Sequence, residues 1–255
     1  MQLAKNFLIM KAKSILPLFL LVLTACGNGN PWTSLKFDGM KGNVSKVKTL
    51  RYGAHEKFGE IMEDYNDLVA VFVREFDEKG HLTKYVEYTE YGAPLIKKEF
   101  EYDENGQAVL QTLSFREDNL VETGRVVDRS KDYVKWEWSD GNEYKSIEEC
   151  FYDGLSCKHF SDNELSLEER IDKKGRLVES QSYYRGGEPT YHCTTWFDDE
   201  KNVVSKEKTE NYYDGYTVTT TYKYPDYDAK GNWVTRHVWE DGEIKYVEKR
   251  EIYYR

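Results

Sequence analysis

The sequence predicts an all-β protein, an extended antiparallel meander of about a dozen strands that forms a partly single-layer sheet. Three observations support this fold class. Turn motifs of the form Asp-x-x-Gly recur along the chain, the segments between them alternate polar and apolar residues, and 15% of the 255 residues are aromatic. Alternation with a period of two, bounded by Gly and Asp, is typical of β-strands. The high aromatic content also argues against a disordered chain.

The composition excludes several classes of protein. Lys and Arg number 36 against 46 Asp and Glu, and the net charge of −10 argues against a nucleic-acid partner, because phosphate contacts need clustered cations. A mean hydropathy of −0.78 excludes a helical membrane bundle over most of the chain. The sequence has no Gly-x-Ser-x-Gly motif, phosphate loop, dinucleotide fingerprint or His-Glu-x-x-His motif. We therefore expect neither catalysis nor a cofactor.

Residues 1–25 are predicted to be a lipoprotein signal peptide. Three lysines precede an apolar run from Ile15 to Leu23, which is too short to span a bilayer. The run ends in Leu23-Thr24-Ala25-Cys26, which resembles the lipobox of bacterial lipoproteins. The resemblance implies cleavage before Cys26 and lipidation of that residue. We expect an outer-membrane lipoprotein that faces either the periplasm or the cell surface.

Residues 26–38 are predicted to form the lipidated cysteine and a flexible tether. The segment Gly27-Asn28-Gly29-Asn30-Pro31 has the small and polar composition of a linker. The remaining residues, 39–255, are predicted to be one domain of β-hairpin repeats.

The repeated turns define this domain. Asp-x-x-Gly motifs begin at Asp77, Asp103, Asp172 and Asp228, and Asp198 begins a variant in which Asn202 replaces the glycine. In such a turn the Asp side chain can accept bonds from backbone N–H groups, and the glycine supplies a positive φ. Shorter Gly-containing turns lie between these motifs, so we expect strands of about 8–10 residues with tight reversals.

The strands differ in how clearly their faces are divided. Tyr216, Val218, Tyr222 and Tyr224 alternate with Thr and Lys, and Trp233, His237 and Trp239 are expected to share one face. Residues 95–102 instead mix Lys and Glu with apolar residues on both faces. That pattern predicts a sheet that is partly wet on both sides. The register is least secure between Arg116 and Lys135, and residues 56–65 fit either a short helix or an irregular hairpin.

Two groups of motifs resemble known repeats. Tyr102-Asp103-x-x-Gly106 and Tyr227-Asp228-x-x-Gly231 resemble the YD repeats of Rhs-type proteins. The Gly-x-Lys-Gly-x-Val start at residues 39–44, Lys230 to Trp233, and the close at residues 250–254 resemble small Gram-negative lipoproteins built from such repeats. The resemblance covers residues 39–255. It implies a fold of YD-type hairpins and no particular function, because the chain is far too short for the toxin-enclosing shell of the long Rhs proteins.

Cys150 and Cys157 lie symmetrically about Asp153-Gly154. In a two-residue hairpin they would be directly opposed, with Cα atoms within disulfide range. Because the predicted compartment is oxidising, we expect a Cys150–Cys157 disulfide. The alternatives are a reduced pair or metal ligation with His159, although the spacing Cys-x6-Cys-x-His fits no common zinc pattern. We therefore predict no metal site.

Cys193 follows His192 directly. Consecutive strand residues point to opposite faces, so these two cannot form a nucleophile–base pair with each other. We expect Cys193 to be a small buried core residue.

The aromatic residues suggest one further site. Trp233, Trp239, Trp196 and Tyr222 are the candidate ligand-binding residues of an aromatic sheet face. The alternative interpretation is that strands of a thin sheet need aromatics simply to cover it.

The sequence therefore leads to a function hypothesis of low specificity. It is a lipid-anchored, non-catalytic binding or scaffolding module, whose partner is another envelope protein that adds a strand to a free sheet edge. A glycan bound on the aromatic face is the alternative. An enzyme would require ionisable groups converging in a deep pocket. The membrane is contacted through the lipid anchor, and no nucleic acid is expected.

Overall fold

The computed structural model describes residues 35, 39–115, 121–141, 145–153, 155–161, 163–184 and 187–255. The predicted signal peptide and Cys26 lie outside these described residues, as does most of the tether, and they remain predictions. The strands are β1 (Val44–Lys57), β2 (Glu60–Phe76), β3 (Leu82–Thr89), β4 (Pro94–Tyr102), β5 (Ala108–Phe115), β6 (Val121–Arg129), β7 (Tyr133–Ser139), β8 (Lys145–Asp153), β9 (Ser156–Ser161), β10 (Glu164–Ile171), β11 (Leu177–Tyr183), β12 (Pro189–Asp198), β13 (Val203–Asn211), β14 (Tyr216–Tyr227), β15 (Trp233–Glu240) and β16 (Glu243–Tyr254). No helix among these residues is long and apolar enough to cross a membrane.

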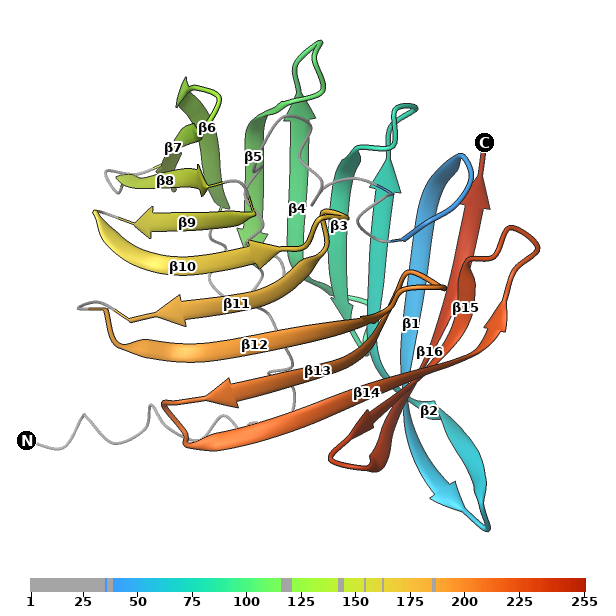
Figure 1. The fold of residues 1–255 in the computed structure, drawn as a ribbon. Coiled ribbons are helices and arrows are strands. Elements are labelled where there is room, and N and C mark those ends of the chain that lie inside the picture. The colour runs from blue at the N-terminus through green and yellow to red at the C-terminus, as the bar shows by residue number, and fades with distance from the viewer. Residues whose placement is uncertain are drawn as a thin grey trace, which may run out of the picture.

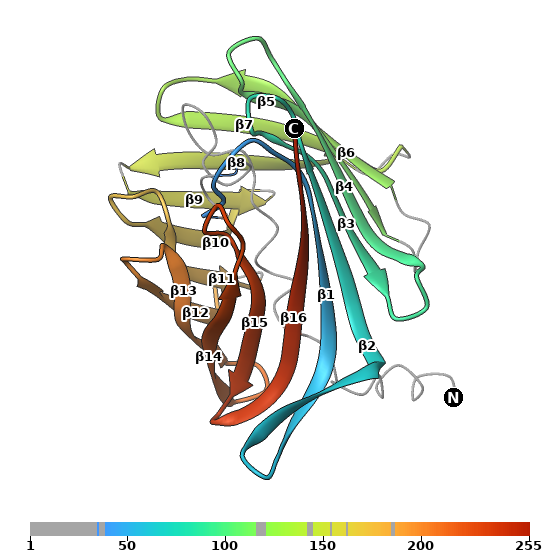
Figure 2. The same ribbon diagram turned by 90° about the vertical axis from the view of Figure 1, so that its right-hand side faces the viewer.

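The strands form a closed antiparallel barrel (Figures 1 and 2). Each strand pairs with its neighbours in sequence, and β1 also pairs with β16, with Val47 opposite Ile252 and Gly53 opposite Tyr246. The predicted all-β, antiparallel meander is confirmed. The predicted open sheet of about a dozen strands is wrong, because the described residues form sixteen strands and the sheet closes on itself. Closure leaves no edge strand in the ring, so binding by strand addition loses its structural basis.

The strand number was underestimated in two segments where the sequence did not define a hairpin. Residues 56–65 belong to a long β1–β2 hairpin whose turn is Phe58-Gly59, with φ values of 56° and 80°. β6 and the start of β7 lie within the segment of insecure register, and their turn is closed by a 2.8 Å bond from Ser130 N to Tyr133 O. Neither turn carries the sequence signature that marks the repeats.

The chemistry of the repeated turns is confirmed. Asp77 Oδ1 accepts bonds from Lys79 N at 2.9 Å and His81 N at 2.8 Å, and Gly80 has a φ of 85°. The same pattern recurs in the turns that begin at Asp103, Asp172 and Asp228. Every Asp-x-x-Gly turn follows an even-numbered strand, so these turns all lie at one end of the barrel, the Asp-turn end. The opposite end is the short-turn end.

A short segment before β1 contacts the β14–β15 turn at the Asp-turn end. Lys41 N donates to Asn232 Oδ1 at 2.6 Å, and Asn232 Nδ2 donates back to Lys41 O at 2.9 Å. Gly42 has a φ of 85°, and a Cβ there would lie 2.9 Å from Cδ of Lys230. The Gly-x-Lys-Gly segment and the Lys-Gly-Asn-Trp segment, far apart in sequence, therefore contact each other.

The two faces of the wall differ in burial. Polar side chains that point into the barrel are nearly inaccessible: Lys98, Gln111, His159, Glu169 and Glu248 are 1–5% exposed. The outward face carries exposed ion pairs, such as Lys97–Glu99 at 2.7 Å. The prediction that residues 95–102 are wet on both sides is thus wrong. The charge pattern there arises because a charged residue, Lys98, faces the interior.

Candidate functional site

The strands that close the barrel share one buried carboxylate. Glu248 on β16 accepts bonds from Arg51 Nε at 2.9 Å on β1 and from Arg236 Nε at 2.8 Å on β15. Burial alone would raise the pKa of Glu248, but Arg236 and Arg51 outweigh it and hold the pKa at about 2. These three residues, the seam triad, form an ion-pair network in which two guanidinium groups compensate the carboxylate charge within the wall.

Two of the four candidate aromatic residues belong to this interior. Tyr222 donates from its hydroxyl to Glu207, and burial raises the pKa of both groups. Trp233 is only 5% exposed, and the guanidinium of Arg250 lies 3.5 Å from its ring centroid. Register shifts in β14 opposite the start of β15 place Trp233 against Tyr227. The predicted common face is therefore wrong for Trp233 and Tyr222, which are not accessible to a large ligand.

Trp196 and Trp239 do lie on the outer face. Trp196 is 42% exposed. A row of cross-strand neighbours runs from Trp196 through Lys206 and Thr221 to Trp239. The two indoles thus occupy one cross-strand row on strands β12 and β15, about 14 Å apart at the usual strand spacing. Lys206 Nζ lies 5.0 Å from the Trp196 ring and Lys223 Nζ lies 4.3 Å from the Trp239 ring. A lysine ammonium is therefore already placed over each ring.

The register behind the predicted disulfide is wrong. Cys150 lies opposite His159, and Cys157 lies opposite Tyr152. The hairpin is therefore shifted by two residues from the symmetric arrangement about Asp153-Gly154. Both cysteines are thiols in the structure, buried on the lumen face with their Sγ atoms within 4.8 Å of each other. The disulfide itself stays a prediction.

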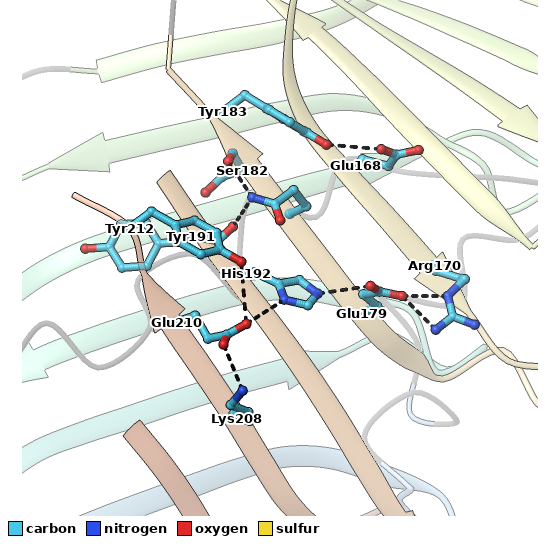
Figure 3. Close-up of polar contacts among 11 residues, drawn as sticks. Glu168, Arg170, Glu179, Ser182, Tyr183, Tyr191, His192, Lys208, Glu210 and Tyr212 are labelled. Atoms are coloured by element: carbon cyan, nitrogen blue, oxygen red, sulfur yellow. Dashed lines mark hydrogen bonds and ion pairs between the residues drawn. The ribbon is translucent and has the colours of Figure 1, made fainter. Parts of the chain in front are cut away.

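A row of alternating charges crosses the outer face of β10 to β13 (Figure 3). His192 Nε2 lies 2.9 Å from Glu179 Oε1, and His192 Nδ1 lies 3.1 Å from Glu210 Oε2. Arg170 Nε donates to Glu179 at 2.8 Å, and Lys208 Nζ donates to Glu210 at 2.8 Å. Partial burial lowers the pKa of His192, but Glu210 and Glu179 outweigh it, so the pKa is raised. This row favours a protonated His192.

Cys193 points away from this row, as predicted. Its Sγ accepts a bond from Thr209 Oγ1 at 3.7 Å on the lumen side, whereas His192 contacts carboxylates outside. Burial raises the pKa of the Cys193 thiol to about 11. A thiol with so high a pKa is a poor nucleophile near neutral pH.

Exposed tyrosines gather at the short-turn end, where the β11–β12 and β13–β14 hairpins reverse. We define the tyrosine rim as Tyr184, Tyr212, Tyr213 and Tyr216, which are 67%, 48%, 87% and 41% exposed. The two turns are joined, because Tyr212 N donates to Thr190 O at 2.9 Å.

Asn211 fixes the shape of the second turn in the rim. It is 1% exposed, and its Oδ1 accepts bonds from Tyr213 N at 2.9 Å and Asp214 N at 3.0 Å. Its Nδ2 donates to Tyr191 Oη at 2.9 Å. The turn that displays Tyr212 and Tyr213 is thus held by a buried side chain and is organised before any ligand arrives.

Sequence reasoning missed the seam triad, the His192 row and the tyrosine rim. A partial signal existed for the rim, since Asn211-Tyr212-Tyr213-Asp214-Gly215 combines a turn motif with two aromatics. The other two features depend on which strands become neighbours. That information requires the register and the closure of the barrel.

Comparisons with known proteins identify no family. No protein-family model matches the chain, and no curated protein matches it. Among solved structures, a porin-like protein from Bacteroides uniformis is similar at 12% identity and a TM-score of 0.42, over 82% of this chain and 96% of that one. A DUF1329 family protein from Desulfovibrio piger is similar at 9% identity and a TM-score of 0.27, over 83% and 86%.

A third solved structure is also similar to this chain. The complex TcdB2-TccC3-Cdc42 is similar at 10% identity and a TM-score of 0.18, over 76% of this chain and 15% of that chain. TM-scores this low carry no argument about function for any of the three. The YD-type resemblance of the sequence therefore stays a prediction.

Proposed function

We propose that the protein is a lipid-anchored barrel of the bacterial envelope that binds another protein through the tyrosine rim, without catalysis. The observation that carries the proposal is the group of four exposed tyrosines on two joined turns. Tyrosine is enriched at protein interfaces, because it offers a large apolar area and a hydroxyl at a low cost in side-chain entropy. A turn held in advance by Asn211 lowers the entropy cost of binding further.

The outer wall supports a barrel that stands in water. Ion pairs occur on the outward face in well-separated parts of the ring: Lys48–Glu251 on β1 and β16, Lys135–Glu149 on β7 and β8, and Lys208–Glu210 on β13. A charge on the lipid face of a membrane barrel costs about 2–4 kcal/mol at the bilayer midplane. A barrel with this wall is better suited to the aqueous side of a membrane, held there by the lipid predicted at Cys26.

Capture from the cells that produce the protein tests this proposal. The tagged lipoprotein would be compared with a Cys26→Ala chain and with a rim variant carrying Tyr184→Ala and Tyr213→Ala. Tyr91→Ala is the matched control, because Tyr91 is 87% exposed in the β3–β4 turn at the same barrel end. We expect a stoichiometric protein that the rim variant loses and the Tyr91→Ala variant keeps.

Two results would reject the proposal. One is a partner retained in full by the rim variant, which would place binding elsewhere on the molecule. The other is the absence of any stoichiometric protein from the wild-type sample after gentle solubilisation. The Cys26→Ala chain separates the roles of the anchor and the barrel, because a partner that needs only the rim is still bound by it in solution.

A glycan ligand is the second candidate, and one observation favours it. Trp196 and Trp239 lie on the same outer row, so a chain of sugars could contact both. Sugar stacking would have to displace the lysines that lie over the two rings. Binding of the purified chain to envelope polysaccharide should then fall about tenfold or more in Trp196→Ala and Trp239→Ala, with Tyr91→Ala unchanged. Equal binding by all variants would reject this candidate.

A further inference from the structure

Five chemically reactive side chains meet on the lumen face of β8, β9 and β10. We call Glu148, Cys150, Cys157, His159 and Glu169 the hairpin cluster. Cys150, Cys157, His159 and Glu169 are 0–4% exposed. Nothing in the proposed binding function uses these residues, which lie inside the wall and away from the tyrosine rim.

The atoms of the cluster contact both nitrogens of the His159 imidazole. His159 Nδ1 lies 3.0 Å from Glu148 Oε1 and 3.4 Å from Cys150 Sγ. Cys150 Sγ lies 4.0 Å from the same Glu148 oxygen. Cys157 completes the set, because one ligand atom each from Cys150, Cys157 and His159 lie within 4.8 Å of one another.

These separations match those of a tetrahedral metal site. Zinc binds sulfur at about 2.3 Å and nitrogen at about 2.0–2.1 Å, which places neighbouring ligand atoms about 3.3–3.8 Å apart. The separations of 3.0, 3.4 and 4.0 Å around Nδ1 bracket that range. Cys157 Sγ lies nearest the other nitrogen, Nε2, so the Cys157 side chain would have to turn toward Nδ1 to bring its sulfur to the fourth corner.

The other imidazole nitrogen has the partner that a metal-binding histidine usually has. His159 Nε2 lies 3.2 Å from Glu169 Oε2, and Glu169 is 3% exposed. A ligating histidine generally donates its second N–H to a carboxylate, which fixes the ring and strengthens the ligand. Cys157 Sγ also lies 3.2 Å from Nε2.

A lysine on β4 balances part of the negative charge of this region. Lys98 is 5% exposed, and the charge of Glu148 acts on it. Burial lowers the pKa of Lys98 to about 8, against the effect of Glu148.

We propose that Cys150, Cys157, His159 and Glu148 bind one Zn²⁺ ion inside the barrel wall, with Glu169 orienting His159. Thiolate and imidazole together select zinc over the hard cations magnesium and calcium. The spacing along the chain hid this site. The ligands come from both strands of the β8–β9 hairpin, so their geometry depends on a register in which Cys150 faces His159.

Zinc binding to the purified Cys26→Ala chain tests the inference. The chain would be reduced, stripped of metal, and given Zn²⁺ both when folded and during refolding, because a buried site can load only as the chain folds. We expect one equivalent of tightly held zinc. Co²⁺ in its place should show thiolate-to-cobalt charge-transfer absorption, which a carboxylate site would not.

The variants make the test specific. Cys150→Ser and Cys157→Ser should each lose the stoichiometric zinc and the charge-transfer band. Glu169→Gln should bind zinc about 10–100-fold more weakly, as expected for loss of a partner that orients a ligand. Cys193→Ser is the matched control, because Cys193 also faces the lumen but lies outside the cluster, and it should keep full binding. Circular dichroism would verify that each variant folds.

Three outcomes would overturn the proposal. The first is less than one equivalent of zinc in the reduced and refolded wild-type chain. The second is binding that survives Cys150→Ser and Cys157→Ser. The third is a Cys150–Cys157 disulfide without metal in protein isolated from the envelope. Each outcome leaves the tyrosine rim untested, so failure here is separable from failure of the proposed binding function.

Discussion

The seam triad and the hairpin cluster are two answers to the same problem, a carboxylate buried in the barrel wall. At the seam, Glu248 is held by Arg51 and Arg236, which supply paired donors and full compensating charge. In the hairpin cluster, Glu148 and Glu169 instead contact a histidine and lie beside thiols. The first arrangement is complete by itself. The second is a set of electron-pair donors that share one imidazole.

The comparison shows that burial of charge does not by itself mark a functional site. Buried ion pairs with good geometry add little net stability over apolar residues, but they are costly to break once present. The seam triad joins the first and last strands, β1 and β16, and so serves closure. The hairpin cluster lies within one continuous run of strands and closes nothing. The zinc proposal accounts for its thiols and imidazole, which the seam triad lacks.

The largest expected effect comes from breaking the seam. Glu248→Ala removes the carboxylate that both arginines contact within the wall and should lower the free energy of unfolding by about 3–5 kcal/mol. Urea denaturation followed by circular dichroism would measure it. Glu248→Gln provides a milder variant should the alanine chain fail to accumulate. A loss below about 1 kcal/mol would mean that the triad is not needed for closure.

The next largest effect should be the loss of stability that acid causes through the seam triad. The pKa of Glu248 is held at about 2 in the folded chain, below the ordinary value of 4.5. A carboxyl whose pKa is lowered by folding stabilises the folded state at any pH above its pKa in the unfolded chain. This stabilisation is lost as the pH falls from about 4.5 toward 2. Unfolding free energies measured over this range should fall steeply in the wild type. The slope should be shallower in Glu248→Gln, and equal slopes would contradict the assignment.

A smaller effect is expected from Glu169→Gln in metal-free protein. The amide can still hydrogen-bond to His159, so we expect a loss of about 1 kcal/mol in unfolding free energy. Saturating zinc should widen this gap, because the wild type binds the metal more tightly and ligand binding stabilises the folded state. A gap that zinc leaves unchanged would argue that the cluster is structural. Urea denaturation with and without zinc measures both values.

The smallest effect should come from the outer wall. Glu251 contacts Lys48 at 3.3 Å, and its side chain is 46% exposed. Glu251→Ala should change the unfolding free energy by at most about 1 kcal/mol, since exposed ion pairs contribute little. This substitution lies only three residues from Glu248 and so is a matched control for the seam. A loss as large as that of Glu248→Ala would show that any change in β16 disrupts closure.

Local features of the fold could be predicted from the sequence, and long-range ones could not. The Asp-x-x-Gly turns were predictable because Asp77 and Gly80 interact within four residues. The meander followed from short turns between alternating segments. Closure was not predictable in this way, because Val47 and Ile252 become neighbours only when the whole wall has curved around. No period-2 pattern specifies which two strands end up side by side.

For the candidate sites too, side-chain directions set by local strand geometry were predictable, and those that depend on register were not. The opposite orientation of His192 and Cys193 followed from strand geometry and was correct. The common face proposed for Trp233 and Trp239 failed because register shifts opposite β15 interrupt the alternation. The register assumed for Cys150 and Cys157 failed for a related reason, since each pairs with a residue two positions away from the expected partner, while the disulfide itself stays a prediction. A one- or two-residue change in register is invisible in composition but decides what each side chain contacts.

The pairing of β1 with β16 closes the barrel at the place where the two ends of the chain meet. Among the strands that the structure describes, all other pairings join strands adjacent in sequence, so this pairing alone must wait for distant segments to meet. Chain entropy should make its formation the slow and late step of folding. The chain ends could also be placed in another turn of the barrel. Linking the ends of β1 and β16 and opening the Phe58-Gly59 turn would give a circular permutant with the same strand neighbours and a different final step.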